Sequence, residues 1–187
     1  MSHRIHNFSA GPAALPDSVR QRLADALAVP DDLTPSVMEI SHRGPRFAAI
    51  AEELMARLRA LMGVGDDHEV LLLHGGANLQ FAWLPMNLAA GGTPAYLLSG
   101  YWGQKAFAEA KRLGAAEVVG DNAEGGFVDL PELGHLPADC AYLHFTGNET
   151  IHGLQFAAPP AAGVPLAADL SSEFLSRPYP YGQLAFA

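Results

Sequence analysis

The stretch Val164-Pro165-Leu166-Ala167-Ala168-Asp169 joins an apolar run to a carboxylate at its end. An apolar run of this length indicates a buried strand, and in open α/β sheets ligands bind at the carboxyl ends of the strands. No basic side chain stands next to Asp169 in the sequence, and an unpaired buried carboxylate is costly. We therefore expect Asp169 to pair with a distant Arg or Lys or with the cation of a ligand. A helix N-cap Asp that follows a strand is the alternative interpretation.

Helical and strand-like segments alternate along most of the chain before this run. The clearest amphipathic pattern is in residues 45–62, where Phe47, Ile50 and Leu54 recur at helical spacing. Periodicity and turn residues predict helices over residues 17–28, 45–62, 78–88 and 102–113, and strands over residues 70–73, 95–98, 117–119, 141–145 and 164–168. This alternation predicts βαβ units, and hence an α/β fold with a mostly parallel sheet and helices on both faces.

The charge and hydropathy of the chain indicate which kinds of partner it can bind and in which cell compartment it is expected. The 187 residues include 11 Lys and Arg against 20 Asp and Glu, which gives a formal net charge of −9. No cluster of Lys and Arg could neutralise a row of phosphates, so we expect no nucleic-acid partner and no membrane partner. The longest weakly polar stretch, residues 156–168, is broken by prolines and is too short to span a bilayer. The first residues lack the apolar core of a signal peptide, so we expect a cytoplasmic protein.

Disulfide, thiol and metal chemistry are not indicated. The single cysteine, Cys140, cannot form an internal disulfide, and its apolar neighbours indicate a small buried side chain rather than a nucleophile. The eight histidines show no metal-ligand spacing, so we predict no metal site.

Residues 74–80, His74-Gly75-Gly76-Ala77-Asn78-Leu79-Gln80, lie between a predicted strand and a predicted helix. Small residues at this place let the backbone approach an anion, while the first N–H groups and the dipole of the helix point at it. The segment is neither GxGxxG nor a Walker loop with its Lys, which disfavours dinucleotides and nucleoside triphosphates. It could cradle another phosphate, and an ordinary Gly-Gly turn is the alternative.

Three more segments carry side chains of kinds that bind ligands. Trp102 follows a predicted strand and can lie flat against an aromatic ligand, although it could equally be a core Trp. Residues 145–153 also follow a strand and gather hydroxyl, amide and carboxylate groups, unless they form a solvated turn. Residues 36–44 place His42 and Arg43 before the long helix. Arg can grip a phosphate or a carboxylate with two hydrogen bonds, whereas an exposed cap region is the alternative.

The order of these segments and their residues resemble those of the phosphoserine aminotransferase family. This family is a branch of the class V, fold-type I enzymes that use pyridoxal 5′-phosphate. Three segments are specific to this branch: Asn7-Phe8-Ser9-Ala10-Gly11-Pro12-Ala13-Ala14-Leu15-Pro16, Ser41-His42-Arg43-Gly44 and Asn148-Glu149-Thr150-Ile151. Residues 74–81, 100–103 and 168–178 match as well, so the resemblance covers essentially the whole chain.

The resemblance implies a fold and an assembly. It implies an N-terminal arm over residues 1–15 and an aspartate-aminotransferase-like, cofactor-binding large domain over residues 16–187. Family members continue further and carry a small C-terminal domain, so we expect this large domain to be incomplete and the small domain to be absent. The full-length form is expected to be a homodimer, and the isolated chain to be marginally stable and prone to aggregate.

The resemblance also implies a pyridoxal phosphate site, carried over residue by residue. The backbone N–H groups of Ala77 and Asn78 would hold the cofactor phosphate, Trp102 would stack on the pyridine ring, and the Thr150 hydroxyl would face the ring's phenolic oxygen. Asp169 would keep the ring nitrogen protonated, which makes the ring an electron sink.

The implied substrate contacts come from an earlier part of the chain. His42 and Arg43 would bind the acidic end of phosphoserine or 2-oxoglutarate, in this subunit's site or in the partner's. Some relatives have Arg where this chain has Asn78, so one contact to the substrate phosphate is expected to differ.

The implied reaction is a transamination in serine and pyridoxine biosynthesis. Phosphoserine and 2-oxoglutarate would exchange with 3-phosphohydroxypyruvate and glutamate. The family's Schiff-base lysine lies a few residues beyond Ala187, and neither Lys105 nor Lys111 matches it. That lysine is both covalent anchor and general base, so we expect no catalytic residue in this chain and no activity from it alone.

Two other functions are compatible with the sequence. The chain could be a non-catalytic remnant or interaction module, or it could belong to a class V enzyme that acts on alanine, serine or cysteine. The pair His42 and Arg43 favours an acidic, phosphorylated substrate over the last of these.

Overall fold

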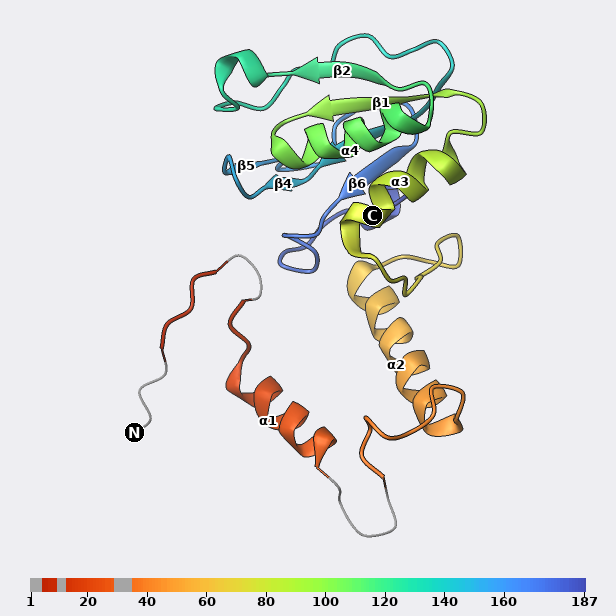
Figure 1. The fold of residues 1–187 in the computed structure, drawn as a ribbon, viewed down its shortest axis with the longest axis vertical. Helices are drawn as coiled ribbons and strands as arrows, with labels where there is room; N and C mark the ends of the chain where they lie inside the picture. The colour runs from red at the N-terminus through yellow and green to blue at the C-terminus, as the bar shows by residue number, and fades with distance from the viewer. Residues whose placement is uncertain (1–4, 10–12, 29–34) are drawn as a thin grey trace. The chain divides into compact units, whose positions relative to one another are not determined.

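A computed structural model of the chain describes residues 5–9, 13–28 and 35–187 (Figure 1). The chain divides into two compact units, Met1–Ala60 and Leu61–Ala187, and each is described by itself. All strands of the described residues belong to the second unit.

Two helices begin in the first unit, and both were predicted from the sequence. Helix α1 comprises Asp17–Leu27 and helix α2 comprises Pro45–Met62. Pro45 suits the first position of α2, because a helix leaves the N–H of that residue unpaired in any case. None of the described residues in either helix is fully buried. The sequence also predicts a turn after the first helix, at Pro30 and over residues 31–35, and all of it except Pro35 lies outside the described residues.

A four-stranded parallel sheet forms the centre of the second unit, which confirms the predicted mostly parallel sheet. Across the sheet the strands run in the order β2-β1-β3-β6, and every neighbouring pair is parallel. A short antiparallel hairpin follows β3. The strands are β1 Thr93–Leu98, β2 Glu117–Asp121, β3 Cys140–Thr146, β4 Asn148–Glu149, β5 Leu154–Gln155 and β6 Leu166–Asp169.

Helices α3 (Gly76–Leu88) and α4 (Tyr101–Leu113) cover one face of the sheet. Side chains alternate between the faces of a strand, so Tyr96 and Tyr142 pack with these helices while Leu97 and Leu143 face the other way. On this face the core contains Phe81, Leu84, Leu98, Ala106, Ala110, Ala116 and Ala167.

The other face of the sheet is packed by the end of α2, by loops and by a short 3₁₀ helix, η2 (Tyr181–Gln183). Another 3₁₀ turn, η1 (Ala123–Gly125), lies in the segment between β2 and β3. The side chains on this face include Met62, Val64, Leu133, Phe156, Tyr179, Tyr181 and Leu184. The predicted α/β architecture with a parallel sheet and helices is therefore confirmed, but α3 and α4 lie on the same face, and the predicted helices on the second face are reduced to the end of α2 and η2.

The predicted strand over residues 70–73 is wrong. These residues form neither strand nor helix, and Leu71, Leu72 and Leu73 are 66%, 57% and 50% exposed. A strand needs a neighbour that pairs with its N–H and C=O groups, and no strand of the described residues pairs with this segment. The outer edge of β6 is instead taken by Phe186, which bridges to Ala167.

Two predicted boundaries also move. Helix α3 begins at Gly76 rather than at Asn78, so the predicted Gly-Gly turn is partly helical. Strand β6 begins at Leu166 rather than at Val164 and extends to Asp169. Pro165 lacks the N–H that a ladder needs, which explains the late start of this strand.

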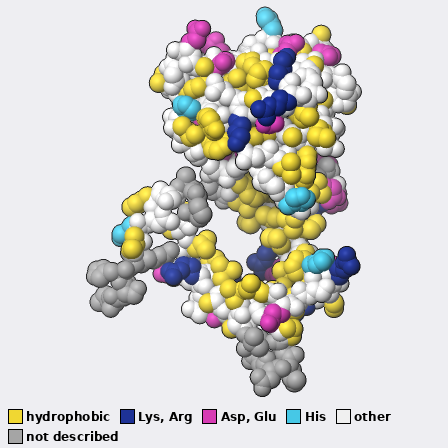
Figure 2. Space-filling model, viewed as in Figure 1, with side chains coloured by type: hydrophobic (Ala, Val, Ile, Leu, Met, Phe, Trp, Pro, Cys, Tyr) yellow, Lys and Arg dark blue, Asp and Glu magenta, His cyan; other side chains and the backbone are white. Residues whose placement is uncertain are grey.

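Hydrophobic side chains reach the surface of the molecule alongside charged ones (Figure 2). No helix among the described residues is long and apolar enough to cross a membrane.

Candidate functional site

Three of the predicted segments meet at one edge of the sheet. Helix α4, with Trp102, follows β1, the loop with Thr150 follows β3, and Asp169 ends β6. Because β1, β3 and β6 are neighbouring parallel strands, their carboxyl ends lie at the same edge. This is the edge at which open α/β sheets bind ligands.

The first turn of α3 presents backbone N–H groups that no side chain caps. Gly75 precedes the helix with a φ of +93°, which favours glycine, and a Cβ on it would collide with the Leu79 side chain. The glycine is therefore required by conformation and by close packing. Among the described residues nothing accepts the first N–H groups of the helix, those of Gly76, Ala77 and Asn78. Such a terminus is suited to an anion.

A cavity of about 890 Å³ is lined both by the first turn of α3 and by the end of β6. Ligand sites commonly have volumes of about 300–1,000 Å³. Of the five predicted cofactor residues, Ala77 and Asp169 line this cavity. Asn78, Trp102 and Thr150 are not among its lining residues, and Asn78 is exposed on α3.

Asp169 is half-buried at the end of β6, where its Oδ1 accepts two hydrogen bonds from Ser171. The backbone N–H of Ser171 donates over 3.0 Å and its hydroxyl over 2.6 Å. This is an Asx turn, and residues 171–176 are turns rather than a helix, so the N-cap alternative is wrong. No Lys or Arg of the described residues forms an ion pair with Asp169. Both bonds use Oδ1, which leaves Oδ2 for a further donor.

His144 lies in the middle of β3 and lines the same cavity as Asp169. It is 1% exposed, stacks on Tyr96 with ring centroids 5.0 Å apart, and meets the edge of Phe81. Within the described part of the chain, neither ring nitrogen has a hydrogen-bond partner, and neither does the buried hydroxyl of Thr146. Burial lowers the pKa of His144 to about 4, against the opposing effect of the Asp169 charge. His144 is therefore neutral near pH 7.

Sequence reasoning missed His144. The only signal for it was one ionisable residue within the apolar strand predicted over residues 141–145, and such a residue is as readily exposed at an edge as buried. Its importance appears only because β3 pairs with β6, with Thr146 opposite Asp169 and His144 opposite Ala167. The parallel register places His144 and Asp169 on the same face of the sheet.

Trp102 and Thr150 are joined by a hydrogen bond. The indole Nε1 of Trp102 donates to the Thr150 hydroxyl over 3.2 Å. The Trp102 ring is partly exposed, which does not fit the alternative of a core Trp, and the Lys105 ammonium lies 5.6 Å from its centroid. The alternative of a solvated turn is wrong for Glu149, which is fully buried next to the exposed Thr150.

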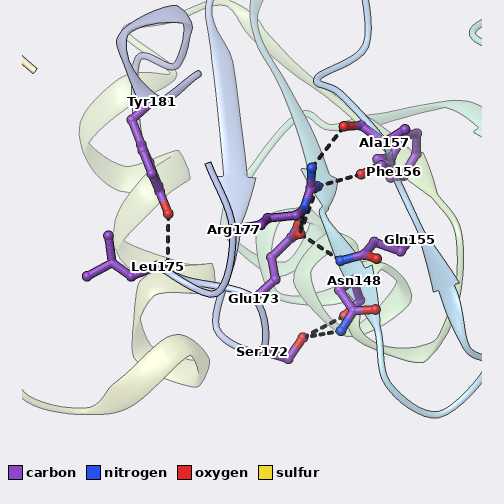
Figure 3. A network of polar contacts seen from close by, with 9 residues as sticks. All are labelled: Asn148, Gln155, Phe156, Ala157, Ser172, Glu173, Leu175, Arg177 and Tyr181. Atoms are coloured by element: carbon purple, nitrogen blue, oxygen red, sulfur yellow. Dashed lines mark hydrogen bonds and ion pairs between the residues drawn. The ribbon is translucent and has the colours of Figure 1, made fainter. Parts of the chain in front are cut away.

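A polar network ties the loop after β6 to the hairpin after β3 (Figure 3). The Arg177 guanidinium donates to Glu173 over 2.9 and 3.0 Å and to the carbonyls of Phe156 and Ala157. Gln155 donates to the same Glu173 oxygen over 2.8 Å. A second link joins Asn148 and Ser172 through two hydrogen bonds of 2.9 Å each. The loop that contains Asp169 and the loop that contains Thr150 are therefore held together.

His42 and Arg43 belong to the first unit, in the turn before α2. Both side chains are exposed, and the backbone N–H of Arg43 donates to the Ser41 hydroxyl over 3.2 Å. Their predicted role in substrate binding stays a prediction.

Cys140, Lys105 and Lys111 are the other ionisable residues that were considered as reactive groups. Burial raises the pKa of the Cys140 thiol, which agrees with the interpretation of this residue as an unreactive one. Lys105 is half-buried beside Trp102, and Lys111 donates to the Ala116 carbonyl over 3.4 Å. Within the described residues no group of three or more His, Cys, Asp and Glu side chains could hold a metal ion.

The fold and this edge of the sheet define a class of protein. Residues 5–184 match the family "Aminotransferase class-V", and the chain belongs to that family.

Within the family, this chain is similar to phosphoserine aminotransferases. It is 45% identical to the phosphoserine aminotransferase of Aromatoleum aromaticum, covering 96% of this chain and 52% of that protein. It is 44% identical to the enzyme of Niallia circulans, with 98% and 52% covered. The chain thus spans about half the length of the curated relatives that it matches.

Solved structures of the same enzyme have the same fold. The phosphoserine aminotransferase of Bacillus circulans subsp. alkalophilus superimposes with a TM-score of 0.90 at 42% identity, over 98% of this chain and 52% of that one. The phosphoserine aminotransferase of Trichomonas vaginalis, described as bound to pyridoxal phosphate, superimposes with a TM-score of 0.90 at 38% identity. It is matched over 97% of this chain and 55% of that one. The predicted fold-type I architecture is confirmed by these matches.

Proposed function

We propose that the cavity binds pyridoxal 5′-phosphate and that the whole protein is a phosphoserine:2-oxoglutarate aminotransferase. One observation carries the proposal: a single cavity is lined by an uncapped helix N-terminus and by a carboxylate without a basic partner among the described residues. Pyridoxal phosphate carries an anionic phosphate and a ring nitrogen that can take up a proton. The N-terminus of α3 therefore suits the phosphate of the cofactor, and Asp169 suits its protonated ring nitrogen.

The polar atoms around the cavity fit the cofactor as well. His144 and Thr146 have buried polar atoms that find no partner among the residues that the structure describes, and buried polar groups normally find one. A ligand, or water ordered by it, that reaches Asp169 would supply such partners. Gly76 lines the cavity, and a Cβ on it would meet nothing within 4 Å, so the space beside the first turn of α3 is open.

Each residue of the site has a proposed role in binding the cofactor. The backbone N–H groups of Ala77 and Asn78 bind the phosphate, and Asp169 holds the proton on the ring nitrogen. When bound, the cofactor supplies an electron sink for negative charge at the substrate's α-carbon. A neutral His144 matters here, because a cationic one would compete with the ring nitrogen for the Asp169 charge. Trp102 limits the motion of the ring by stacking on it.

We also propose that His42 and Arg43, which belong to the first unit, bind the substrate. The exposed Arg43 can grip the phosphate or carboxylate of phosphoserine or the carboxylates of 2-oxoglutarate, and His42 can add a donor. The names of the relatives favour these substrates over alanine, serine or cysteine. A cytoplasmic homodimer, as expected for the complete protein, remains part of the proposal.

Binding of pyridoxamine 5′-phosphate to the chain tests the cofactor site. This probe cannot form a Schiff base, so its binding does not depend on a lysine. We expect calorimetry to show binding by the chain, and Asp169→Asn to weaken it by about tenfold or more, since hydrogen bonds to charged groups contribute about 1.5–3 kcal/mol. Asp129→Asn, which removes the same charge from an exposed loop position, is the matched control and should leave the affinity unchanged.

Two outcomes would contradict the proposed site. A chain that does not bind the probe favours a non-catalytic interaction module, and equal effects of the two Asn variants remove Asp169 from its role. In parallel, pyridoxal phosphate and borohydride should leave no stoichiometric adduct on Lys105 or Lys111. Such an adduct, together with turnover of phosphoserine, would show that this chain supplies the catalytic lysine.

A further inference from the structure

The N-terminus of α4 is capped from a distant part of the chain. The residue before the helix, Gly100, has no side chain to offer, and the cap comes instead from Glu149. Its Oε2 accepts the backbone N–H of Trp102 over 3.0 Å, and its Oε1 accepts that of Gly103 over 2.8 Å. Both carboxylate oxygens are thus used on the first turn of one helix.

Glu149 is 0% exposed, and no Lys or Arg of the described residues pairs with it. The charge is compensated by the two N–H groups and by the positive end of the helix dipole. Hydrogen bonds from backbone N–H to a carboxylate are among the stronger ones in proteins. Two N–H groups of the first turn of α4 are therefore held by one buried side chain, and a third, that of Tyr101, donates to Nδ1 of His152 over 3.4 Å.

One glycine, Gly100, makes room for this contact, whereas Gly103 is not required for it. A Cβ on Gly100 would lie 2.7 Å from Cδ of Glu149 and 2.7 Å from Nδ1 of His152. A Cβ on Gly103 would lie 3.4 Å from Oε1 of Glu149, which is ordinary contact. The φ of Gly100 is 165°, an extended value that any residue adopts, so the requirement for glycine at this position is steric.

The same loop holds Trp102 at a second point. Thr150, the next residue after Glu149, accepts the hydrogen bond from the Trp102 indole. Glu149 thus fixes the backbone of Trp102, and Thr150 fixes its ring. Neither contact is local in sequence, because Glu149 and Thr150 lie 47 and 48 residues after Trp102.

We propose that Glu149 is a positioning residue that sets the Trp102 ring, and with it the stacking surface for the ligand ring. The proposal rests on the proposed function for the identity of the ligand, but the placement of Trp102 by Glu149 does not depend on it. Glu149→Gln removes the charge and turns an amide donor toward one of the two N–H groups. The first turn of α4 then loses one acceptor, and the Trp102 ring gains freedom.

Fluorescence can follow Trp102 alone in a Trp83→Phe background, because the chain has two tryptophans. We expect Glu149→Gln to raise the acrylamide quenching of Trp102 and to weaken pyridoxamine 5′-phosphate binding by about tenfold. Val119→Ala is the control for a general loss of stability, since Val119 is buried on the outer strand β2 in the core on the other face of the sheet. It should destabilise the chain without changing the quenching of Trp102 or the affinity for the probe.

Equal changes in the two variants would mean that Glu149 is only a structural residue, and unchanged quenching in Glu149→Gln would overturn the proposal. If the chain binds no probe at all, the proposed function fails, while the quenching comparison still decides the role of Glu149. If Glu149→Gln does not fold, amide hydrogen exchange of the unmodified chain tests the proposal instead. The Trp102 and Gly103 amides should exchange slowly for a first helical turn, and fast exchange of both would overturn the proposal.

Discussion

Acid should destabilise this chain through one buried histidine. In the folded chain burial lowers the pKa of His144 to about 4, whereas its ordinary value is 6.5. Between about pH 6.5 and pH 4 the unfolded chain therefore binds a proton at His144 that the folded chain does not. Stability is then lost as the pH falls from about 6.5 to about 4, and this contribution is fully present above pH 6.5.

The size of the effect follows from the difference between the two values. A difference of about 2.5 pH units, at about 1.4 kcal/mol per unit, corresponds to about 3 kcal/mol of unfolding free energy. Many single domains have only about 5–15 kcal/mol in total, so the loss is large enough to measure. His144→Phe should remove it. Because no described residue forms a hydrogen bond with either ring nitrogen and the ring packs on Tyr96 and Phe81, Phe should cost little at neutral pH.

Urea unfolding followed by circular dichroism, at pH values from 7 to 4, measures this loss in both proteins. The unmodified chain should lose about 3 kcal/mol more than His144→Phe over this range. His135→Phe, at an exposed position, is the control and should keep the full loss, since an exposed side chain meets water in both states. Parallel pH curves for the unmodified chain and His144→Phe would refute the reasoning.

Two further substitutions test the contacts that hold the site together. Arg177→Met should lower the free energy of unfolding by about 2 kcal/mol, because it leaves the buried Glu173 unpaired, with the effect moderated by the 30% exposure of Arg177. Adding Glu173→Leu should recover part of this loss in urea unfolding, and a further equal loss would show that the pair is not coupled. Gly100→Ala should cost about 1–3 kcal/mol through its collision with Glu149 and His152. Gly114→Ala, where a Cβ would meet nothing within 4 Å, should be close to neutral in the same assay, and equal costs at both glycines would contradict the steric argument.

Most of the fold could be predicted from the sequence. Helix α2 has the predicted bounds, and α1, α4, β1, β2 and β3 differ from the predictions by one or two residues at most at either end. These elements depend on patterns within one segment, such as the helical spacing of Phe47, Ile50 and Leu54. The segments that contain Trp102, Thr150 and Asp169 could also be assigned to strand ends, because a parallel sheet puts all such ends on one edge.

Residues 70–73 and Glu149 could not be predicted in the same way. An apolar run such as Val70 to Leu73 suits a strand, but pairing is decided by another part of the chain, and here no described strand lies beside it. Glu149 stands in a polar stretch that suits a solvated turn, and only the approach of α4 encloses it. Local patterns describe what a segment can form and carry no information on its neighbours.

The sequence by itself determined the α/β alternation, the presence of a helix after Gly75, the carboxylate at the end of β6 and the resemblance to one enzyme family. Only the tertiary structure decided that Ala77 and Asp169 line one cavity, that a neutral His144 lies on the face of Asp169, and that Glu149 holds Trp102 in place. The physical reason is that periodicity and turn chemistry act over a few residues. The burial of a charge, its partner and its pKa depend instead on groups brought together from segments far apart in the chain.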